Sequence, residues 1–279
     1  MLFGAHIEAT EDAIDVREVG RLLEAHGFES LFLPEHTHLP VGGASVHPGG
    51  AHRHDRLRRF LDPLIALTAV AGATERLRLG TGVCLITEHD PIVLAKQTAA
   101  LDLLSGGRFL FGIGAGWNRE ELRNHGTEPA DRWRVMRERA LAIRRIWTED
   151  EAEFHGRHVD FGPIWSWPKP AQRPHPPIIV GGEGPRVLAR VLDYGDEWGP
   201  NDHDALPGRV AELSRLAAER GRAPVPVTAF HVAPEIERLR HYAAAGITRC
   251  VFSLPSAGAA EVRPAVERLT ALVQSLGEG

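Results

Sequence analysis

The sequence predicts an α/β fold, a (β/α)8 TIM barrel in which each of eight parallel strands is followed by a helix. Strand-like apolar runs alternate with helical patterns along the whole chain. The runs are mostly apolar, which is typical of parallel strands covered on both faces. Eight such units fit 279 residues, close to the usual length of this barrel. A doubly wound open sheet is the alternative, and it leaves the last two units unexplained.

The elements follow one another in regular order. Strands are expected over residues 2–8, 29–34, 77–85, 108–114, 177–181, 196–200, 226–232 and 249–254. Helices are expected over residues 12–26, 62–74, 91–105, 131–147, 185–194, 205–220, 235–245 and 260–276. Asp62 and Asp90 are N-cap acceptors, each followed by a proline at the first helical position. Three helices are expected to stop at glycines, namely Gly27, Gly221 and Gly246.

Insertion loops are expected at two places. Residues 35–61 follow the second strand, and residues 148–176 precede the fifth strand and contain Trp165 and Trp167. Long loops inside a compact domain are usually lids or binding segments. The chain shows neither an internal repeat nor a linker-like stretch, so residues 1–279 are expected to form a single domain.

The composition restricts the kinds of molecule that the chain is expected to bind. The chain has 32 Lys and Arg against 37 Asp and Glu, for a net charge of −5, without the basic excess of proteins that bind nucleic acid or anionic membranes. No apolar run approaches the roughly 18 residues of a spanning helix, and the first residues lack a signal-peptide pattern. Cys84 and Cys250 lie in apolar runs, which indicates reduced core thiols. We therefore expect a cytoplasmic protein that acts on small molecules.

Function in this barrel is confined to one end, because active sites lie at the C-terminal ends of the strands and on the loops that follow. In chain order, the residues expected there are His6, Glu8, Glu35, His36, His38, Thr81, Gly82, Val83, Gly114, Gly116, Trp117, Asn118, residues 181–186, Trp198, Asn201, His231 and Ser253.

A glycine-rich turn leads from the fifth expected strand into a helix that Pro185 is expected to open. It comprises Gly181, Gly182, Glu183, Gly184, Pro185 and Arg186. Glycines let the backbone approach a ligand closely, and the N–H groups at a helix start attract anions. Arg186 adds a charged donor. The turn therefore predicts a phosphate site, with a tight turn selected for sterics alone as the alternative.

Glycines also end the third and fourth expected strands, within residues 79–83 and 112–118. The second run is not a dinucleotide fingerprint, because Trp117 stands where G-x-G-x-x-G requires its third glycine. We expect these glycines to clear space for a flat ring, with the Asn118 amide contacting ring-edge atoms. A strand end loosened by glycine is the alternative interpretation.

Two histidines follow the second strand. His36 is a candidate proton donor or acceptor, because imidazole titrates near neutral pH, and a structural histidine is the alternative. His36 and His38 also have the spacing of a metal pair. The ends of strands five, six and eight lack the further ligands of a metal-dependent barrel, so no metal site is expected. The basic run 52–59 is either a contact for an anionic tail or a solvated surface.

Short motifs recur in a fixed order along nearly the whole chain. They are Pro34-Glu-His36, Leu77-Arg-Leu-Gly-Thr-Gly-Val83, Leu94-Ala-Lys-Gln-Thr98, Leu101-Asp-x-Leu-Ser-Gly-Gly-Arg108, Gly112-Ile-Gly-Ala-Gly-Trp-Asn118, Phe154-His-Gly156, Pro168-Lys-Pro170, Pro177-Ile-Ile-Val-Gly-Gly182 and Tyr194-Gly-Asp-Glu-Trp198. In this order and spacing they resemble the bacterial luciferase-like flavin monooxygenases, and within them the branch that depends on the deazaflavin coenzyme F420.

The resemblance implies a barrel that lays an isoalloxazine or deazaflavin ring across its strand ends. It places His36 beside the reactive ring carbon as the catalytic residue. It places Gly82-Val83 at a bulge where relatives hold a non-proline cis peptide against the ring. The cofactor-binding residues that it implies are Glu35, Thr81, Gly82, Val83, Asn118 and the phosphate loop Gly181, Gly182, Glu183, Gly184, Pro185 and Arg186.

The same resemblance implies an oxidoreductase that transfers a hydride between coenzyme F420 and an organic small molecule, with His36 relaying a proton. An FMN-dependent monooxygenase that inserts oxygen is the first alternative. A catalytically idle flavin-binding relative and a metal-dependent barrel hydrolase are the others. By resemblance a homodimer is expected, and the candidate pocket walls are Trp117, Trp165 and Trp198.

Overall fold

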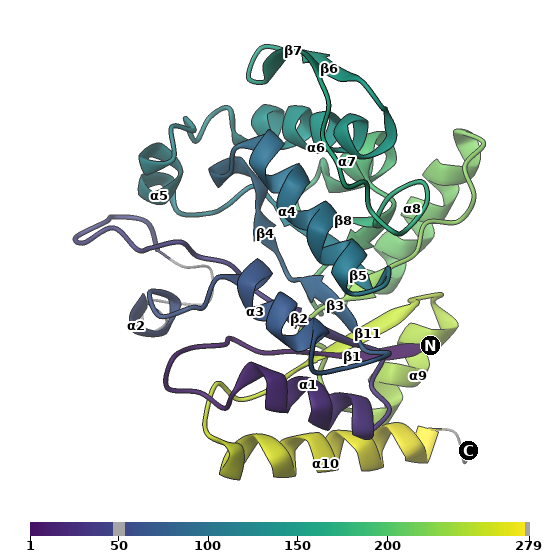
Figure 1. Ribbon diagram of the computed structural model, residues 1–279. Helices are drawn as coiled ribbons and strands as arrows, with labels where there is room; N and C mark the ends of the chain where they lie inside the picture. The colour runs from purple at the N-terminus through teal and green to yellow at the C-terminus, as the bar shows by residue number, and fades with distance from the viewer. Residues whose placement is uncertain (47–53, 277–279) are drawn as a thin grey trace.

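The computed structural model describes residues 1–46 and 54–276 and confirms the predicted (β/α)8 barrel (Figure 1). Its wall strands are parallel and lie in the order β10-β11-β1-β2-β3-β5-β8-β9. Two isolated parallel bridges, Trp198 with Val227 and Asn201 with Phe230, join the two ends of this order. The sheet is thereby closed, and the C-terminal ends of its strands meet at one rim.

The secondary structure agrees with the predicted order, with ends shifted by a few residues. The wall strands are β1 (Leu2–His6), β2 (Ser30–Leu33), β3 (Arg78–Thr81) with its continuation β4 (Cys84–Leu85), β5 (Phe109–Gly114), β8 (Ile178–Gly181), β9 (Glu197–Gly199), β10 (Thr228–Ala229) and β11 (Arg249–Ser253). The helices between them are α1 (Val16–Ala25), α3 (Pro63–Ala71), α4 (Pro91–Leu104), α6 (Arg132–Thr148), α7 (Val187–Tyr194), α8 (Leu206–Glu219), α9 (Ile236–Ala244) and α10 (Ala259–Leu276).

Local chemistry accounts for several of these boundaries. The Asp62 carboxylate accepts the Ile65 N–H at 2.9 Å and caps α3, as predicted. Asp90 caps α4 by accepting the N–H groups of Ile92 and Val93. Cys84 and Cys250 are buried free thiols, also as predicted.

Three local predictions need correction. The strand expected over 77–85 is interrupted at Gly82 and Val83, so that β3 pairs with β2 and β5 whereas β4 pairs with β5. Helix α7 begins at Val187 and not at Pro185, because the carbonyl of Gly184 accepts the Val187 N–H in a preceding turn. The strand expected over 226–232 is reduced to the two residues of β10.

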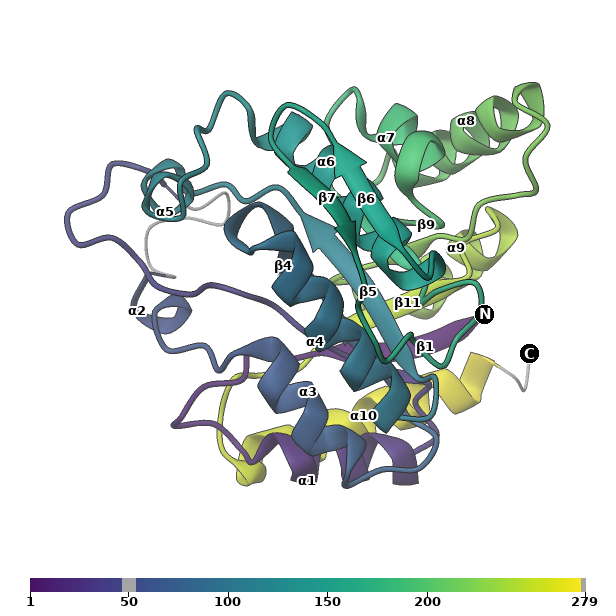
Figure 2. The ribbon, with the colours of Figure 1, turned by 45° about the horizontal axis from the view of Figure 1, so that its top comes forward.

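The two insertions lie in different places on the barrel. The second contains an antiparallel hairpin, β6 (Ala152–His155) with β7 (Asp160–Ile164), which packs on α6 outside the barrel wall (Figure 2). The first contains the short helix α2 (His54–Leu57) and, like α5 (Arg119–Asn124), lies beyond the strand ends (Figure 1). Only the first insertion therefore approaches the predicted site. Among the described residues, no helix has both the length and the apolarity to cross a membrane.

The opposite end of the barrel is held by a buried ion network. Arg249, the first residue of β11, binds Glu29 through two hydrogen bonds of 2.8 and 2.9 Å and Glu197 at 2.9 Å. Burial raises the pKa of Glu197, although the charge of Arg249 opposes that shift. The N-terminal end of the strands in such barrels serves stability rather than catalysis, and the network links β9 and β11 to Glu29, the residue before β2.

Candidate active site

The rim carries a non-proline cis peptide between Gly82 and Val83, at the position that the resemblance implies. Both residues are partly exposed, in contrast to Thr81 and Cys84 on either side, which are buried. The bulge therefore presents its backbone and the Val83 side chain to the space above the barrel.

The glycines around this bulge have a different role from the one predicted. A β-carbon on Gly112 would lie 1.9 Å from the carbonyl oxygen of Thr81, and one on Gly114 would lie 2.5 Å from Cγ2 of Val83. One on Gly181 would lie 3.0 Å from Cγ1 of Val83. These glycines make room for the protein's own bulge and not directly for a ligand ring. Because Gly181 has no side chain, Val83 of the bulge packs against the start of the predicted phosphate loop.

A cavity of about 190 Å³ lies over the bulge. It is lined by His6, Glu8, Pro34, Glu35, His36, Leu57, Phe60, Gly82, Val83, Leu85, Trp117 and His231. A second cavity of about 410 Å³, lined by residues 44–46 and by α5, shares Trp117 with the first. The structure thus brings the predicted catalytic histidine and the predicted bulge to one open cavity, and Trp117 lines both cavities.

His36 is held in one tautomer by two partners. Its Nδ1 lies 2.7 Å from Oε2 of Glu121, and the indole N–H of Trp117 donates to its Nε2 over 3.1 Å. An indole nitrogen can only donate, so Nε2 must carry the lone pair and Nδ1 the proton. His36 is therefore a neutral imidazole whose unprotonated nitrogen is on the Trp117 side, and only 6% of its side chain is exposed.

The partner of His36 comes from helix α5, whose first turn is fixed by Asn118. The Asn118 side-chain oxygen accepts the N–H groups of Glu120 and Glu121, each at 3.1 Å. This N-cap role explains the buried position of Asn118 and leaves its Nδ2 without an acceptor among the described residues. Glu121 also accepts the Thr37 N–H at 3.2 Å, so both of its oxygens are bound to the segment that carries His36.

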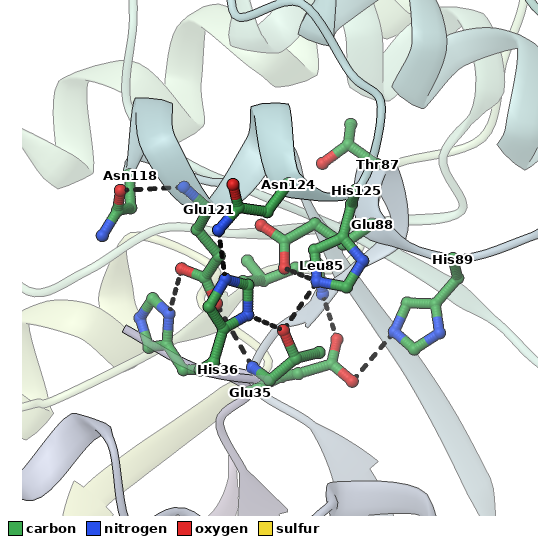
Figure 3. A network of polar contacts seen from close by, with 12 residues as sticks. Glu35, His36, Leu85, Thr87, Glu88, His89, Asn118, Glu121, Asn124 and His125 are labelled. Atoms are coloured by element: carbon green, nitrogen blue, oxygen red, sulfur yellow. Dashed lines mark hydrogen bonds and ion pairs between the residues drawn. The ribbon is translucent and has the colours of Figure 1, made fainter. Parts of the chain in front are cut away.

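Glu35 is buried, and its carboxylate is paired within the protein. Its carboxylate lies 2.9 Å from Nε2 of His89 and accepts the Leu85 N–H (Figure 3). Burial opposes ionisation, but the hydrogen bond and charge of His89 outweigh it and lower the pKa of Glu35. The same contact raises the pKa of His89 against its own desolvation. The pair therefore forms an ion bridge behind β4.

Within the described residues, Glu35, Cys84 and His89 form the group whose ligand atoms all lie within 4.8 Å of one another, as a metal site requires. The suggested pair of His36 and His38 does not belong to it. His38 instead bonds Thr37 and the Asn124 amide. Since Glu35 and His89 bind each other and burial raises the pKa of the Cys84 thiol, we interpret this group as a structural ion pair beside a thiol.

Glu88 is a buried carboxyl that sequence reasoning missed. It lies on the short helix η2 (Ile86–Glu88), between Glu121 and His125 (Figure 3). Neither of its oxygens has a hydrogen-bond donor among the described residues. Burial, together with the negative charges of Glu121 and Glu35, raises the pKa of Glu88 to about 9. These surroundings favour the protonated form of the Glu88 carboxyl.

The predicted phosphate loop leaves backbone donors available. The N–H groups of Glu183, Gly184 and Arg186 have no acceptor within the part of the chain that the structure describes. Gly182 has φ +110° and open space at its α-carbon, and Arg186 is exposed. Such a turn before a helix suits an anion. The Glu183 carboxylate accepts a hydrogen bond of 2.9 Å from the Asn201 N–H.

Arg209 of α8 is a second cation at this loop that the sequence did not indicate. It donates to the carbonyl of Glu183 at 2.9 Å, and its guanidinium lies 5.7 Å from the Trp198 ring centroid. Its buried Nε has no partner, and no described carboxylate pairs with it. Trp198 is fully buried and donates to the Gly182 carbonyl, so it supports the loop and is not an exposed wall.

Opposite His36, the cavity is lined by a residue with unusual backbone geometry. His231 has φ 57° and is the one non-glycine residue with positive φ in the described ranges 1–46 and 54–276. Its Nδ1 lies 2.8 Å from the Ser253 hydroxyl, and its ring meets His6 edge-on with centroids 4.7 Å apart. Strained backbone of this kind is concentrated at functional sites.

Other predicted site residues take structural positions. Thr81 is fully buried, and its hydroxyl donates to the Gly112 carbonyl at 2.7 Å. Trp165 is 79% exposed on the outer hairpin and does not line either cavity. In the basic run 52–59, residues 52 and 53 lie outside the described residues, and Arg59 pairs with Glu11 at 2.6 Å. The described part of the run is thus a surface paired with acids.

Of the three residues that sequence reasoning missed, Glu121 carried a weak sequence signal, whereas Glu88 and Arg209 carried none. Glu121 stands three residues after the N-cap Asn118, where a glutamate is ordinary helix-start chemistry. It shares one helix face with His125, four residues later. An acid and a histidine four residues apart, directly after a glycine-rich strand end, form the pattern that would have indicated Glu121. Glu88 and Arg209 are brought to the site by the closure of the barrel, for which local sequence carries no signal.

Comparison with known proteins agrees with the fold. A family model described as luciferase-like monooxygenase matches residues 2–271. An uncharacterized protein of Mycobacterium tuberculosis is 40% identical over 278 residues, covering 97% of this chain and 98% of that protein. The FMNH2-dependent dimethylsulfone monooxygenase of Pseudomonas putida is 34% identical over 79% of this chain and 58% of its own length.

Among solved structures, the coenzyme F420-dependent tetrahydromethanopterin reductase of Methanopyrus kandleri superposes with a TM-score of 0.73. It is 16% identical, with 96% of this chain and 97% of that chain covered, and so reports on the fold. The match of the family model over nearly the whole chain, and the relatives above 30% identity, decide the assignment. The chain belongs to the luciferase-like monooxygenase family.

Proposed function

We propose that this chain is an oxidoreductase that binds coenzyme F420 over the Gly82-Val83 bulge and exchanges a hydride between it and an organic small molecule. The proposal is supported most by one juxtaposition. The cavity over the bulge contains a neutral His36 with a lone pair on Nε2, and the bulge touches the start of an anion-binding turn through Val83 and Gly181. A planar ring and its phosphate would thus bind next to each other.

The residues present suit such a cofactor. Gly82 and Val83 would support the ring, and the free N–H groups of residues 183, 184 and 186, with the guanidinium groups of Arg186 and Arg209, would hold its phosphate. The Asn118 Nδ2 would donate to the ring edge. When bound, coenzyme F420 supplies the hydride donor or acceptor.

The protein's own part in the chemistry is proton handling. The lone pair on Nε2 of His36 can accept a proton from a substrate hydroxyl once the Trp117 N–H yields its place. The Glu121 carboxylate on Nδ1 stabilises the imidazolium that results. Leu57, Phe60 and Leu85 line the same cavity, exclude water and strengthen these interactions.

An FMN-dependent monooxygenase remains the second candidate, and one observation favours it. The dimethylsulfone monooxygenase of Pseudomonas putida, which its name describes as FMNH2-dependent, shares 34% identity with this chain. The bulge and the phosphate loop fit either cofactor, since both carry a tricyclic ring and a phosphate. The first function is preferred because His36, with its lone pair and its carboxylate partner, provides a base for hydride chemistry.

A titration with oxidised and reduced F420 and FMN, followed by absorbance and fluorescence, tests the proposal. We expect micromolar or tighter binding of F420, lost in Gly182→Asp and kept in His36→Ala, which instead loses turnover of an identified substrate. Tighter binding of FMN than of F420 would favour the second candidate. Binding of neither cofactor would refute both.

We further propose a homodimer in the cytoplasm, as the resemblance implies. Analytical ultracentrifugation of the purified protein tests the oligomeric state, and a monomer at micromolar concentration would contradict it.

A further inference from the structure

Three arginines gather beside the predicted phosphate loop, where helices α6 and α7 begin. Arg186 ends the loop, Arg190 lies one turn further along α7, and Arg132 is the first residue of α6. Because residues four apart share one face of a helix, Arg186 and Arg190 lie on the same side of α7. The two helices contact each other and lie side by side in both ribbon views (Figure 1, Figure 2). The arginine cluster therefore extends from the loop toward α6.

Trp133 holds two of these arginines. The guanidinium carbon of Arg190 lies 3.7 Å from the centroid of the Trp133 ring, and that of Arg132 lies 5.2 Å from the same centroid. A guanidinium stacked on an aromatic ring keeps its charge, and its N–H groups stay available to an acceptor. Burial lowers the pKa of Arg190, and the charges of Arg186 and Arg132 add to this shift, as expected for cations that lie close together.

The protein does not neutralise the charge of the arginine cluster. Asp131, the residue before α6, is bound by Arg134 at 2.7 Å. Asp193 of α7 is bound by Arg137 at 2.5 Å. Within the described part of the chain, the three cluster arginines form no ion pair, and the buried Nε of Arg132 has no hydrogen-bond partner. An uncompensated group of cations, in a chain whose net charge is −5, favours an anionic ligand at this place.

We propose that Arg132, Arg186 and Arg190 bind a chain of carboxylates that extends from the cofactor beyond its phosphate. The inference rests on the proposed function, because coenzyme F420 carries an oligoglutamate tail after its phosphate, whereas FMN ends at the phosphate. Arginine binds carboxylates through paired N–H donors, so repeated carboxylates suit a row of arginines. The cluster would then select F420 over FMN, a choice that the bulge and the phosphate loop leave open.

The position of the cluster fits a tail that leaves the phosphate loop. Arg186 is both the last residue of the loop and the first cation of the cluster, so the two sites are continuous. Arg190 is half-buried against Trp133, whereas Arg186 is exposed. The tail would therefore lie along the surface and stay partly in water, and its contribution to affinity should fall as salt is added.

The length of the tail can be varied on the wild-type protein. F420 with several glutamates and the precursor form without glutamates are titrated separately, and binding is followed by deazaflavin fluorescence. We expect the glutamate-bearing form to bind about tenfold more tightly at low salt, and the difference to shrink below about threefold in about 0.5 M NaCl. Equal affinity of the two forms at low salt would overturn the proposal and leave the proposed function intact.

Substitutions separate the tail site from the phosphate site. Arg132→Gln combined with Arg190→Gln should abolish the preference for the glutamate-bearing form and leave the affinity for the glutamate-free form unchanged. Arg134→Gln is the matched control, because Arg134 lies on α6 and already pairs with Asp131. A preference that survives in the double variant would overturn the assignment of the tail to these arginines.

A measurement without cofactor tests the cluster even if no form of F420 binds. Free penta-γ-glutamate is added to ¹⁵N-labelled protein at low salt, and the Trp133 indole signal is identified by its absence in Trp133→Phe. We expect this signal to shift at millimolar peptide in the wild type and in Arg134→Gln, but not in the double variant. An unchanged signal in the wild type would overturn the carboxylate site. A shift without binding of any F420 form would refute the proposed function and retain the carboxylate site.

Discussion

The indole N–H of Trp117 donates to Nε2 of His36 over 3.1 Å, and this single contact defines the protonation of the candidate base. It also means that a substrate hydroxyl must displace the indole before His36 can take its proton. Trp117 lines both cavities at the rim.

Replacing Trp117 with phenylalanine keeps the ring but removes the donor. We expect His36 to keep the Nδ1–H tautomer in ¹⁵N NMR spectra, because the Glu121 carboxylate can only accept from Nδ1, and the Nε2 signal to shift because its indole donor is lost. Trp165→Phe, on the exposed hairpin, is the control. A proton on Nε2 instead of Nδ1 in the wild type, or an Nε2 signal that does not shift in Trp117→Phe, would contradict the assigned contacts.

Gly114→Ala tests whether the glycines serve the bulge. The new β-carbon would lie 2.5 Å from Cγ2 of Val83, so Val83 must move or the variant must lose about 1–3 kcal/mol of stability, as overpacked cores do. Gly208→Ala, in α8 with no atom near its β-carbon, should instead stabilise the fold slightly. Urea unfolding of both variants measures this, and equal stability of the two would refute the packing argument.

Arg209→Ala removes a cation from the phosphate loop. Loss of one hydrogen bond to a charged group costs about 1.5–3 kcal/mol, so we expect cofactor affinity to fall about tenfold or more. Arg215→Ala is the matched control, because Arg215 lies on the same helix and pairs with Glu219 at the surface. Titration of F420 into each variant measures the two affinities. Equal affinity in both variants would exclude Arg209 from the site.

Glu88→Gln should stabilise the protein, and more so at high pH. The folded protein holds the Glu88 proton up to a pH of about 9, whereas the unfolded chain loses it near the ordinary value of 4.5. The folded state therefore binds more protons between these values, and the stability of the wild type falls as pH rises. We expect a gain of about 1–3 kcal/mol at pH 7 that disappears below pH 4.5.

Urea unfolding across this pH range measures the Glu88 effect, with Glu128→Gln as the reference. A Glu88→Gln variant that is less stable than the wild type at pH 8 would show that Glu88 is ionised in the folded protein.

Arg249→Met tests the ion network at the far end of the barrel. The substitution leaves Glu29 and the buried Glu197 without their shared partner, and breaking such a pair costs about 3–5 kcal/mol. Arg240→Met removes an exposed pair with Glu237 and should change stability by less than about 1 kcal/mol. The midpoints of urea unfolding compare the two, and cofactor binding should survive in both because neither residue lies at the rim.

Local patterns were sufficient for most of the architecture. Alternation of apolar runs with helical periods, and caps such as Asp62 and Asp90, depend on neighbours a few residues away, so the sequence alone predicted the strands, the helices and the barrel. The outer hairpin β6–β7 was missed because its strands are short and mostly polar and partly exposed, without the clear alternation of a half-buried strand.

The same local reasoning identified His36 and the loop 181–186, since active residues of a barrel follow its strands. It misjudged the role of the glycines. Gly114 and Gly181 are required by their contact with Val83, which lies far from both in the chain. It could not indicate Glu88 or Arg209 at all.

What the sequence alone determined is therefore the order of elements and the rim on which function lies, because both follow from short-range periodicity and from the geometry of parallel strands. Only the tertiary structure decided which protons and charges meet there. The tautomer of His36 and the protonated state of Glu88 depend on burial and on partners from separate elements, and these become neighbours only when the barrel closes.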